Sequence, residues 1–291
     1  MPTNILVTGA KGQLGSELRY LSENEPSLCE HFNFIFADRK ILDITSQSAI
    51  EQLCVSHNVH AIINCAAYTA VDKAEVEQDA AYSINHHAVE NLASIAKKKS
   101  IKLIHISTDY VFDGKNYKPY IETDIPNPQN IYGKSKLAGE QAMQSINPEN
   151  SIIIRTSWVY SSFGNNFVKT ILRLGQERDE LNVVVDQIGS PTYARDLARA
   201  ILQIIPQLNN KQAGIYHYSN EGICSWYDFA NAIIETADIK CKINAIKSAD
   251  YPSVANRPMN VEIDKEKIQL EFYITLNSWR DSLSNLIGTY V

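Results

Sequence analysis

ILVTGAKGQLG, residues 5–15, decides the fold, because a short β-branched run leads directly into a glycine-rich turn that opens a helical pattern. Glycines at this spacing permit a tight turn, a close backbone approach to a phosphate and close packing of helix on strand. The first turn of a helix also offers unpaired N–H groups and the positive end of its dipole to an anion. An isolated match of this kind is as often a plain strand–helix turn. The residues expected to contact a bound phosphate are Gly9, Gly12, Gln13, Leu14 and Gly15.

Outward from this unit, short apolar runs alternate with longer amphipathic stretches through the first two thirds of the chain. Strands are expected at Ile5–Thr8, Asn33–Ala37, Ala61–Cys65, Leu103–Ser107 and Ile152–Thr156. Near-continuous apolar strands separated by helices are typical of a parallel sheet covered on both faces. The pattern predicts an α/β protein with a Rossmann-type doubly wound parallel sheet, whose ligands bind at the carboxyl ends of the strands.

The alternation loosens after Trp158, which predicts a smaller α/β C-terminal substrate domain joined to the first by several chain crossings. We expect the Rossmann domain to comprise residues 1–157 and about 183–208, and the smaller domain residues 158–182 and about 209–291. The longest expected helix is Asp79–Lys99, and the one nearest to candidate chemistry is Ser135–Ser145. Later elements are expected at Asn166–Glu177, Val183–Val185, Arg195–Ile205, Ile215–Ser219, Trp226–Ala237 and Trp279–Ile287.

Composition excludes several classes of function. The 291 residues are 44% apolar and 21% charged, with a formal net charge of −6, whereas a nucleic-acid binder usually has a basic face and a high pI. Five dispersed cysteines without a CxxC pair favour a reducing compartment. No leader-like segment or membrane-length apolar run is visible. We therefore expect a cytoplasmic protein with no nucleic-acid or membrane partner.

A carboxylate follows the second predicted strand. Asp38 lies at about the distance from the glycine loop at which a carboxylate holds an adenosine ribose, although a solvated loop aspartate is the alternative. Arg39 and Lys40 follow, and cations there can hold a 2′-phosphate. The position predicts a dinucleotide, with NADPH favoured modestly and NADH also accepted.

Further contacts with such a cofactor are expected at two loops. Asp43 and Ile44 are placed to border an adenine ring. Small residues follow the third strand, where the chain must pass close to the cofactor. The residues expected there are Ala66, Ala67 and Tyr68.

Tyr132-Gly133-Lys134-Ser135-Lys136 is the strongest chemical signal. Tyrosine and lysine at i and i+4 share one helix face, and an ammonium beside a phenol favours the phenolate and lowers its pKa from near 10 toward the working range. Lys136 can also bind the nicotinamide ribose. Thr108, at the end of the fourth strand, can donate to a substrate carbonyl as charge develops on its oxygen. A YxxxK pattern by itself is more often a pair of exposed surface residues on a helix. Here it follows the phosphate loop and Thr108 in the chain, and this order favours a catalytic role.

Seven segments carry a resemblance: GAKGQLG, NCAAYTAVDKAE, STDYVFDG, YGKSKLAGE, RTSWVYSSFGNNFVKT, DQIGSPT and NRPMN. With them the chain resembles the dTDP-4-dehydrorhamnose reductase family of the extended short-chain dehydrogenase/reductase superfamily. The resemblance implies hydride transfer from NAD(P)H to C4 of dTDP-4-dehydro-L-rhamnose. It also implies that Tyr132 protonates the alkoxide with assistance from Lys136, and that Thr108 and Asp109 hold the sugar. Trp158 is expected to pack against the substrate, with a core or interface tryptophan as the alternative.

One feature departs from the family. Some members hold Mg²⁺ at a dimer interface through two glutamates; Glu17 matches the first, but Arg195 stands where the second would be, with Asp196 beside it. We therefore expect no metal and a monomer or weak homodimer.

Two other functions stay open at this stage. One is an epimerase or 4,6-dehydratase of the same superfamily, although dehydratases carry Thr-Asp-Glu where this chain has Asp109-Tyr110. The other is a dinucleotide-binding regulatory subunit without catalysis. The intact Thr108, Tyr132 and Lys136 argue against the second.

Overall fold

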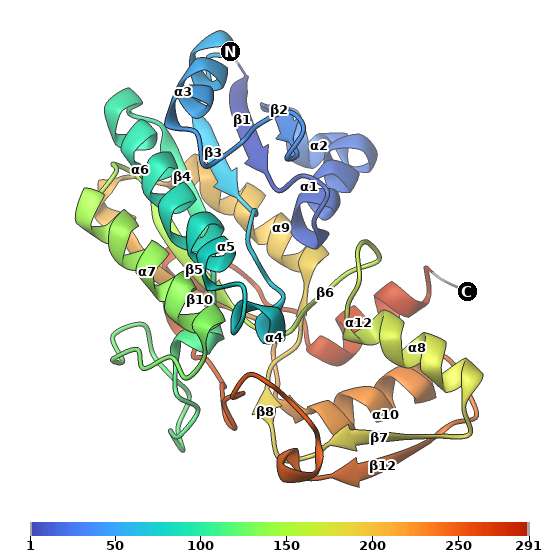
Figure 1. Cartoon of the computed structure of the whole chain (residues 1–291). Coiled ribbons are helices and arrows are strands. Elements are labelled where there is room, and N and C mark those ends of the chain that lie inside the picture. The colour runs from blue at the N-terminus through green and yellow to red at the C-terminus, as the bar shows by residue number, and fades with distance from the viewer. Residues whose placement is uncertain (1, 290–291) are drawn as a thin grey trace.

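The computed structural model describes residues 2–289 and contains a central sheet of six parallel strands in the order β10-β5-β4-β3-β1-β2 (Figure 1). The Rossmann-type α/β fold predicted from the sequence is therefore confirmed. Chain order reverses between β1 and β3, which is where an open α/β sheet binds its ligand. The strands are β1 (Thr3–Thr8), β2 (Phe32–Ala37), β3 (Ala61–Asn64), β4 (Lys102–Thr108), β5 (Ile152–Thr156) and β10 (Gly214–Tyr218).

Helices cover both faces of this sheet, as Figure 1 shows. Ile5 and Val7 of β1 belong to the core under α1 (Gln13–Asn24), α9 (Ala194–Ile204) and α11 (Glu266–Phe272). Leu6, between them, belongs to the opposite core, under α3 (Gln47–Ser56), α6 (Ala88–Lys99) and α7 (Ile131–Ile146). This alternation follows from the two-residue period of a strand, and burial of each such side chain contributes roughly 1.5–3 kcal/mol.

A smaller unit lies beside the carboxyl edge of the sheet (Figure 1). Its core is rich in aromatic side chains, among them Tyr160, Phe229 and Trp279. Its main elements are α8 (Phe167–Glu177), β7 (Glu180–Val184), α10 (Trp226–Thr236), β12 (Lys242–Ile246) and α12 (Trp279–Ile287). Short strands cross between the two units: β6 (Val159–Tyr160), β8 (Ile188–Gly189), β9 (Thr192–Tyr193) and β11 (Cys224–Ser225). Three short α-helices are α2 (Pro26–Cys29), α4 (Val71–Ala74) and α5 (Gln78–Tyr82).

Two strands, β10 and β7, pair with partners outside the domains to which their residue numbers were expected to belong. β10 completes the central sheet beside β5, because Tyr216 and Tyr218 fill the same core as Ile152 and Ile154. β7 pairs with β12 in the smaller unit instead of continuing into the Rossmann unit. The division of the chain into two domains stays a prediction.

The expected helix Asp79–Lys99 is three segments, since a π-helical turn at Ser83–His87 joins α5 to α6. α7 begins four residues earlier than Ser135, at Ile131. Asn130 caps it there, because its Oδ1 accepts a hydrogen bond of 2.8 Å from the N–H of Gly133.

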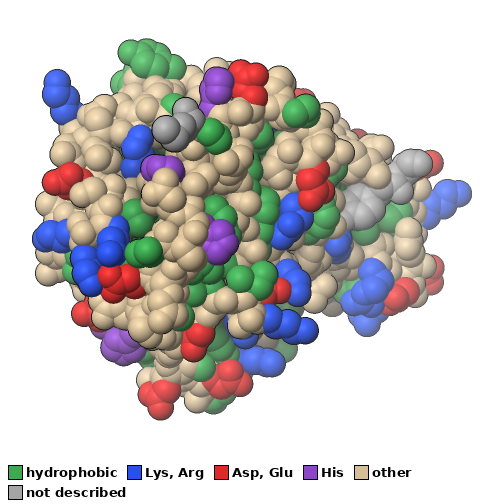
Figure 2. Space-filling view, turned by 90° about the horizontal axis from the view of Figure 1, so that it is seen from above, with side chains coloured by type: hydrophobic (Ala, Val, Ile, Leu, Met, Phe, Trp, Pro, Cys, Tyr) green, Lys and Arg blue, Asp and Glu red, His purple; other side chains and the backbone are tan. Residues whose placement is uncertain are grey.

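On the face seen in Figure 2, acidic and basic side chains are interspersed. Such mixing agrees with the small net charge of −6. Within residues 2–289, no helix combines the length and apolarity needed to cross a bilayer.

Candidate active site

The glycine loop forms a cradle at the carboxyl end of β1. Gly9 has φ +64°, and a side-chain carbon there would lie 2.7 Å from the backbone nitrogen of Ala66. At Gly15 such a carbon would lie 2.6 Å from the carbonyl oxygen of Gly9. α1 begins after Gly12 without a side-chain cap, so the N–H groups of its first turn face the loop. These features fit a bound phosphate.

Gln13 and Leu14 use their side chains for packing within the protein. Gln13 Nε2 donates to the carbonyl of Val159 (3.2 Å), and its Oε1 accepts from Asn166 Nδ2 (3.0 Å). Leu14 is buried in the core beneath α1. Contacts of these two residues with a dinucleotide would therefore come from their backbone.

Asp38 follows the last residue of β2 and is held by several contacts. Its carboxylate forms an ion pair with Lys11 of the glycine loop and accepts the N–H of Lys40 at 2.8 Å. The ion-paired hydrogen bond with Lys11 holds the pKa of Asp38 below its usual value. Arg39 is exposed beside it. Lys11 was missed from the sequence, because nothing in the spacing shows that it reaches Asp38.

Asp43 and Ile44 differ in what they can offer. Asp43 is exposed, and hydrogen bonds from Thr45 (side chain 2.7 Å, backbone 2.9 Å) lower its pKa. The Ile44 side chain is buried in the core under α3. An adenine ring beside this loop would meet the Asp43 side chain and the Ile44 backbone.

Ala66, Ala67 and Tyr68 are half-buried after β3. The backbone N–H and carbonyl of Tyr68 both bond the Asn85 side chain, at 2.9 and 3.0 Å. The Tyr68 hydroxyl donates to Glu77 (2.6 Å). The loop is thus held in one conformation against Gly9.

Tyr132 and Lys136 lie on the first turns of α7. Gly133 permits close packing there, because a side-chain carbon at this position would lie 2.2 Å from the carbonyl oxygen of Tyr110. Lys136 is 1% exposed, and its Nζ donates to the carbonyl of Ile106 at 2.6 Å. Burial lowers the pKa of Lys136 to about 8.

Burial raises the pKa of Tyr132 to about 12, and a side-chain hydrogen bond with Thr108 opposes this rise. The expected lowering of the Tyr132 pKa toward neutrality is therefore wrong, because burial outweighs the other influences on it, and Lys136 Nζ donates to the Ile106 carbonyl. A phenol with this pKa is protonated at neutral pH, so Tyr132 carries the proton that reduction of a carbonyl requires.

Thr108 and Asp109 lie together at the end of β4. The Thr108 hydroxyl donates to Asp109 Oδ1 (2.8 Å) and accepts the N–H of Tyr110 (3.2 Å). Asp109 is 2% exposed, its Oδ2 has no hydrogen-bond partner among residues 2–289, and burial raises its pKa to about 7. A buried unpaired oxygen of this kind is costly and suits a ligand hydroxyl.

A buried ion pair supports these residues from below. Arg155 of β5 binds Glu140 of α7 through two nitrogens, with Nη2 2.7 Å from Oε2. Ser107 donates to the other carboxylate oxygen of Glu140. No local sequence pattern indicates this pair, because its partners come from different elements.

Trp158 is held in an unusual conformation. Its φ of +47° lies in the left-handed region, which is rare for an aromatic residue and often marks a functional position. Its ring stacks on that of Trp226 with centroids 3.6 Å apart and planes at 11°. A side-chain carbon at Gly189 would lie 2.8 Å from the Trp158 ring.

A cavity of about 600 Å³ opens in the smaller unit between α8 and β7. Its lining includes Phe167, Trp226, Tyr251 and Arg257, so it meets the Trp158–Trp226 stack. Arg257 also pairs with Asp72 (2.7 Å). The volume suits a small-molecule ligand. Neither Trp226 nor Arg257 was assigned a role from the sequence.

The carboxylates expected near a family magnesium site do not fit a cation. Glu17 is fully buried, with Oε2 2.8 Å from Arg195 Nε and Oε1 accepting from Ser161 at 2.7 Å. Asp196 is turned inward, where it accepts from Ser282 and Asn220.

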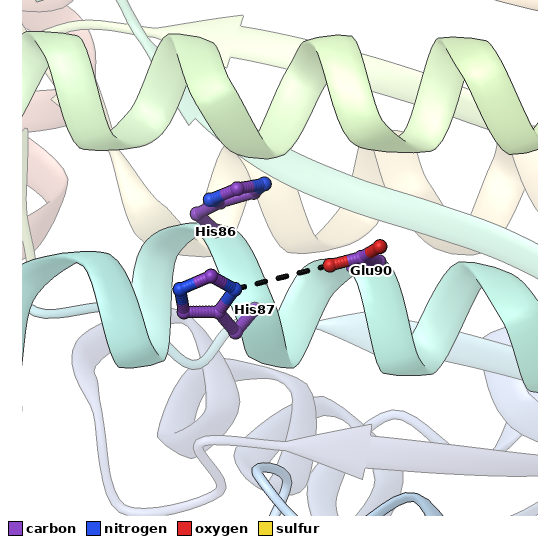
Figure 3. A group of neighbouring side chains, drawn as sticks. All are labelled: His86, His87 and Glu90. Carbon is purple, nitrogen blue, oxygen red and sulfur yellow. Dashed lines mark ion pairs between the residues drawn. The ribbon is translucent and has the colours of Figure 1, made fainter.

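Figure 3 shows another group, His86, His87 and Glu90, at the π-turn. Their ligand atoms lie within 4.8 Å of one another, but His87 and Glu90 are exposed. His87 Nδ1 lies 3.8 Å from Glu90 Oε2, and the ring centroids of His86 and His87 are 4.5 Å apart, so the three side chains contact one another directly.

Comparisons with known proteins agree with this geometry. Residues 3–291 match the model of the family described as the RmlD substrate binding domain. The chain is 43% identical to the dTDP-4-dehydrorhamnose reductase of Aggregatibacter actinomycetemcomitans, with 97% of each chain covered. It is 39% identical to that of Escherichia coli K12, over 98% of this chain and 97% of the other.

A solved structure gives the same result. The dTDP-4-dehydrorhamnose reductase of Bacillus anthracis str. Ames in complex with NADP has a TM-score of 0.92 at 41% identity, covering 99% of this chain and 100% of the other. The phosphate cradle, the Thr108–Tyr132–Lys136 arrangement and this similarity over the full length lead to one conclusion. The chain belongs to the dTDP-4-dehydrorhamnose reductase family.

Proposed function

We propose that this chain reduces the C4 keto group of dTDP-4-dehydro-L-rhamnose with NADPH, and also with NADH, to give dTDP-L-rhamnose. The observation that carries the proposal is the meeting of Thr108, Tyr132 and the unpaired oxygen of Asp109 at the end of β4. A proton donor, a hydroxyl and an unsatisfied buried acceptor there suit a keto sugar with neighbouring hydroxyl groups.

The residues around the glycine cradle fit the cofactor, which supplies the hydride when bound. The first turn of α1 would hold its diphosphate. Asp38 would face the adenosine ribose, while Lys11 and Arg39 would offset the repulsion between that carboxylate and a 2′-phosphate. Lys136 lies deeper, where the nicotinamide ribose is expected.

The proton chemistry follows from the state of each side chain. Tyr132, with its pKa raised by burial, remains a phenol at neutral pH and donates to the C4 alkoxide. On substrate binding, the Thr108 hydroxyl would turn from Asp109 Oδ1 to the keto oxygen and donate to it as charge develops there. Asp109 accepts a hydrogen bond from a sugar hydroxyl, and Trp158, fixed by its stack on Trp226, forms a wall against the sugar.

The nucleotide part of the substrate would occupy the cavity between α8 and β7. Phe167 and Trp226 offer aromatic surface for a base, and Arg257 offers a guanidinium for the diphosphate. The enzyme would work in the cytoplasm as a monomer or weak homodimer without a metal.

The test is an NADPH-oxidation assay with dTDP-4-dehydro-L-rhamnose, run beside UDP- and GDP-linked 4-keto sugars. Turnover with the dTDP sugar that yields dTDP-L-rhamnose supports the proposal. Faster turnover of another nucleotide sugar, or a product epimerised or dehydrated without net reduction, would favour the related superfamily enzymes. Binding of NADPH without turnover of any sugar would favour a regulatory subunit.

A further inference from the structure

A row of buried polar side chains crosses the central sheet behind the active site. Strand register places Thr8 of β1 opposite Asn64 of β3, and Asn64 opposite His105 of β4. Thr8 Oγ1 donates to Asn64 Oδ1 (2.6 Å), and Asn64 Nδ2 lies 3.0 Å from His105 Nδ1. The other ring nitrogen, Nε2, lies 3.3 Å from Lys136 Nζ. The row therefore ends on the lysine of the YxxxK pair.

The backbone fixes which way the Asn64 amide points. The N–H of Ala66, which can only donate, bonds Asn64 Oδ1 at 3.3 Å. The amide nitrogen must therefore face His105 Nδ1, and since an amide nitrogen only donates, Nδ1 is an unprotonated acceptor. His105 is fully buried, and burial holds its pKa well below the usual value. A neutral imidazole carries one proton, so the proton of His105 is on Nε2, the nitrogen that faces Lys136.

This tautomer restricts the charge state of Lys136. An ammonium has only N–H groups and would present one of them to the N–H of His105 Nε2. A neutral amine has a lone pair that accepts from Nε2 while its own N–H donates to the Ile106 carbonyl. Both contacts of Lys136 are satisfied only by the amine.

The other ionisable groups around Lys136 do not reverse this preference. Glu140, one turn along α7, favours the ammonium, but both of its oxygens are already bound by Arg155 and Ser107. Tyr132 on the same helix stays neutral, and Asp109 at the end of β4 bonds Thr108. Burial of Lys136 lowers its pKa, and so favours the neutral amine as the N–H of His105 does.

We propose that His105 is a positioning residue that donates from Nε2 to the nitrogen of Lys136 and favours its neutral form. The effect of His105 on catalysis rests on the proposed reductase activity, whereas its hydrogen bond to Lys136 does not. After Tyr132 gives its proton to the alkoxide, the phenolate must be reprotonated, and Lys136 as an ammonium is the adjacent donor. A lysine whose two forms lie close in free energy at neutral pH passes that proton readily and regains one from solvent. His105 moves the lysine toward this balance.

The first test is independent of turnover. Nitrogen NMR of the protein labelled with ¹⁵N-histidine distinguishes protonated from unprotonated ring nitrogens, and His105→Gln assigns the signals. We expect a proton on Nε2 and none on Nδ1 across the neutral range. A proton on Nδ1, or an imidazolium at neutral pH, would overturn the proposal whether or not the enzyme reduces the sugar.

The second test uses two replacements of similar size. In His105→Gln the terminal amide keeps a donor near the position of Nε2, whereas His105→Leu fills the space without one. Reduction needs protonated Lys136, so the rate falls as pH rises through the lysine pKa. We expect His105→Leu to move this fall upward by about one pH unit, because the donor to the amine is lost, and His105→Gln to stay near the wild type.

A purely structural role gives a different result. It would lower the melting temperature and kcat of His105→Leu while leaving the midpoint of the alkaline fall unchanged, and this outcome would refute the proposal. If His105→Leu does not fold, the NMR measurement and the profile of His105→Gln still decide it, since a shifted midpoint in His105→Gln would also contradict the donor role.

Discussion

Replacing Arg195 with methionine leaves the Glu17 carboxylate buried without its cation. In the structure Glu17 is fully enclosed, Arg195 Nε lies 2.8 Å from Oε2, and the guanidinium covers the Tyr20 ring at 4.0 Å. Removing one partner of a buried ion pair costs about 3–5 kcal/mol. At about 2 °C per kcal/mol for a chain of this size, the melting temperature should fall by roughly 6–10 °C.

A matched control is available on the surface. Arg173 pairs with Glu177 one turn along α8, and both side chains are more than half exposed. Arg173→Met should therefore change stability by at most about 1 kcal/mol. Differential scanning calorimetry of Arg195→Met, Arg173→Met and the double variant Glu17→Gln/Arg195→Met measures the contrast. The double variant should recover part of the loss, because its buried amide carries no charge.

The same pair predicts that Mg²⁺ is needed neither for assembly nor for activity. Mg²⁺ requires hard oxygen ligands, and here Glu17 is taken by Arg195 and Ser161 while Asp196 is hydrogen-bonded inward. Light scattering and activity should be unchanged by EDTA and by restored Mg²⁺. A dimer that dissociates with EDTA and reforms with Mg²⁺ would refute the reasoning, as would an Arg195→Met variant as stable as Arg173→Met.

Three further predictions concern the proposed reaction. Tyr132→Phe should lower kcat roughly 10²–10⁴-fold with NADPH binding nearly intact, and more than about a tenth of wild-type kcat would show that Tyr132 is not the acid. Both cofactors should work, with NADPH modestly favoured. Kinetics with each cofactor should show a smaller preference for NADPH in Arg39→Ala or Lys11→Ala. An unchanged preference would show that the replaced cation plays no part in binding the 2′-phosphate. Trp158→Ala should weaken use of the sugar nucleotide by roughly 1–3 kcal/mol without harming the fold, whereas a lower melting temperature with unchanged KM would indicate a structural residue.

Local sequence signals predicted most of the fold. The strand Ile152–Thr156 and the helix Trp279–Ile287 have the predicted bounds, because β-branched runs and helical periodicity are short-range properties. The start of α7 was missed since it depends on one cap, Asn130. β10 joins the central sheet although its residues fall in the range expected for the smaller domain, because the sheet that a strand joins depends on long-range packing.

The site divides in the same way. Tyr132 and Lys136 are one helical turn apart, and Thr108 ends a strand, so local spacing is enough to predict them as site residues. Arg257 pairs with Asp72 across a separation of 185 residues, which no local pattern reveals.

The position of His105 shows why strand ends alone do not locate every residue that serves the site. β3 pairs with β4 only as far as Asn64 opposite His105, whereas β5 pairs with β4 as far as Thr156 opposite Thr108. β4 therefore runs three residues past the end of β3, and that overhang carries Thr108 out to Tyr132. The same overhang leaves His105 inside β4, level with the end of its shorter neighbour and beneath Lys136. His105 can reach Lys136 because it lies in β4 opposite the last residue of β3. That position depends on the register between strands, which the sequence does not display.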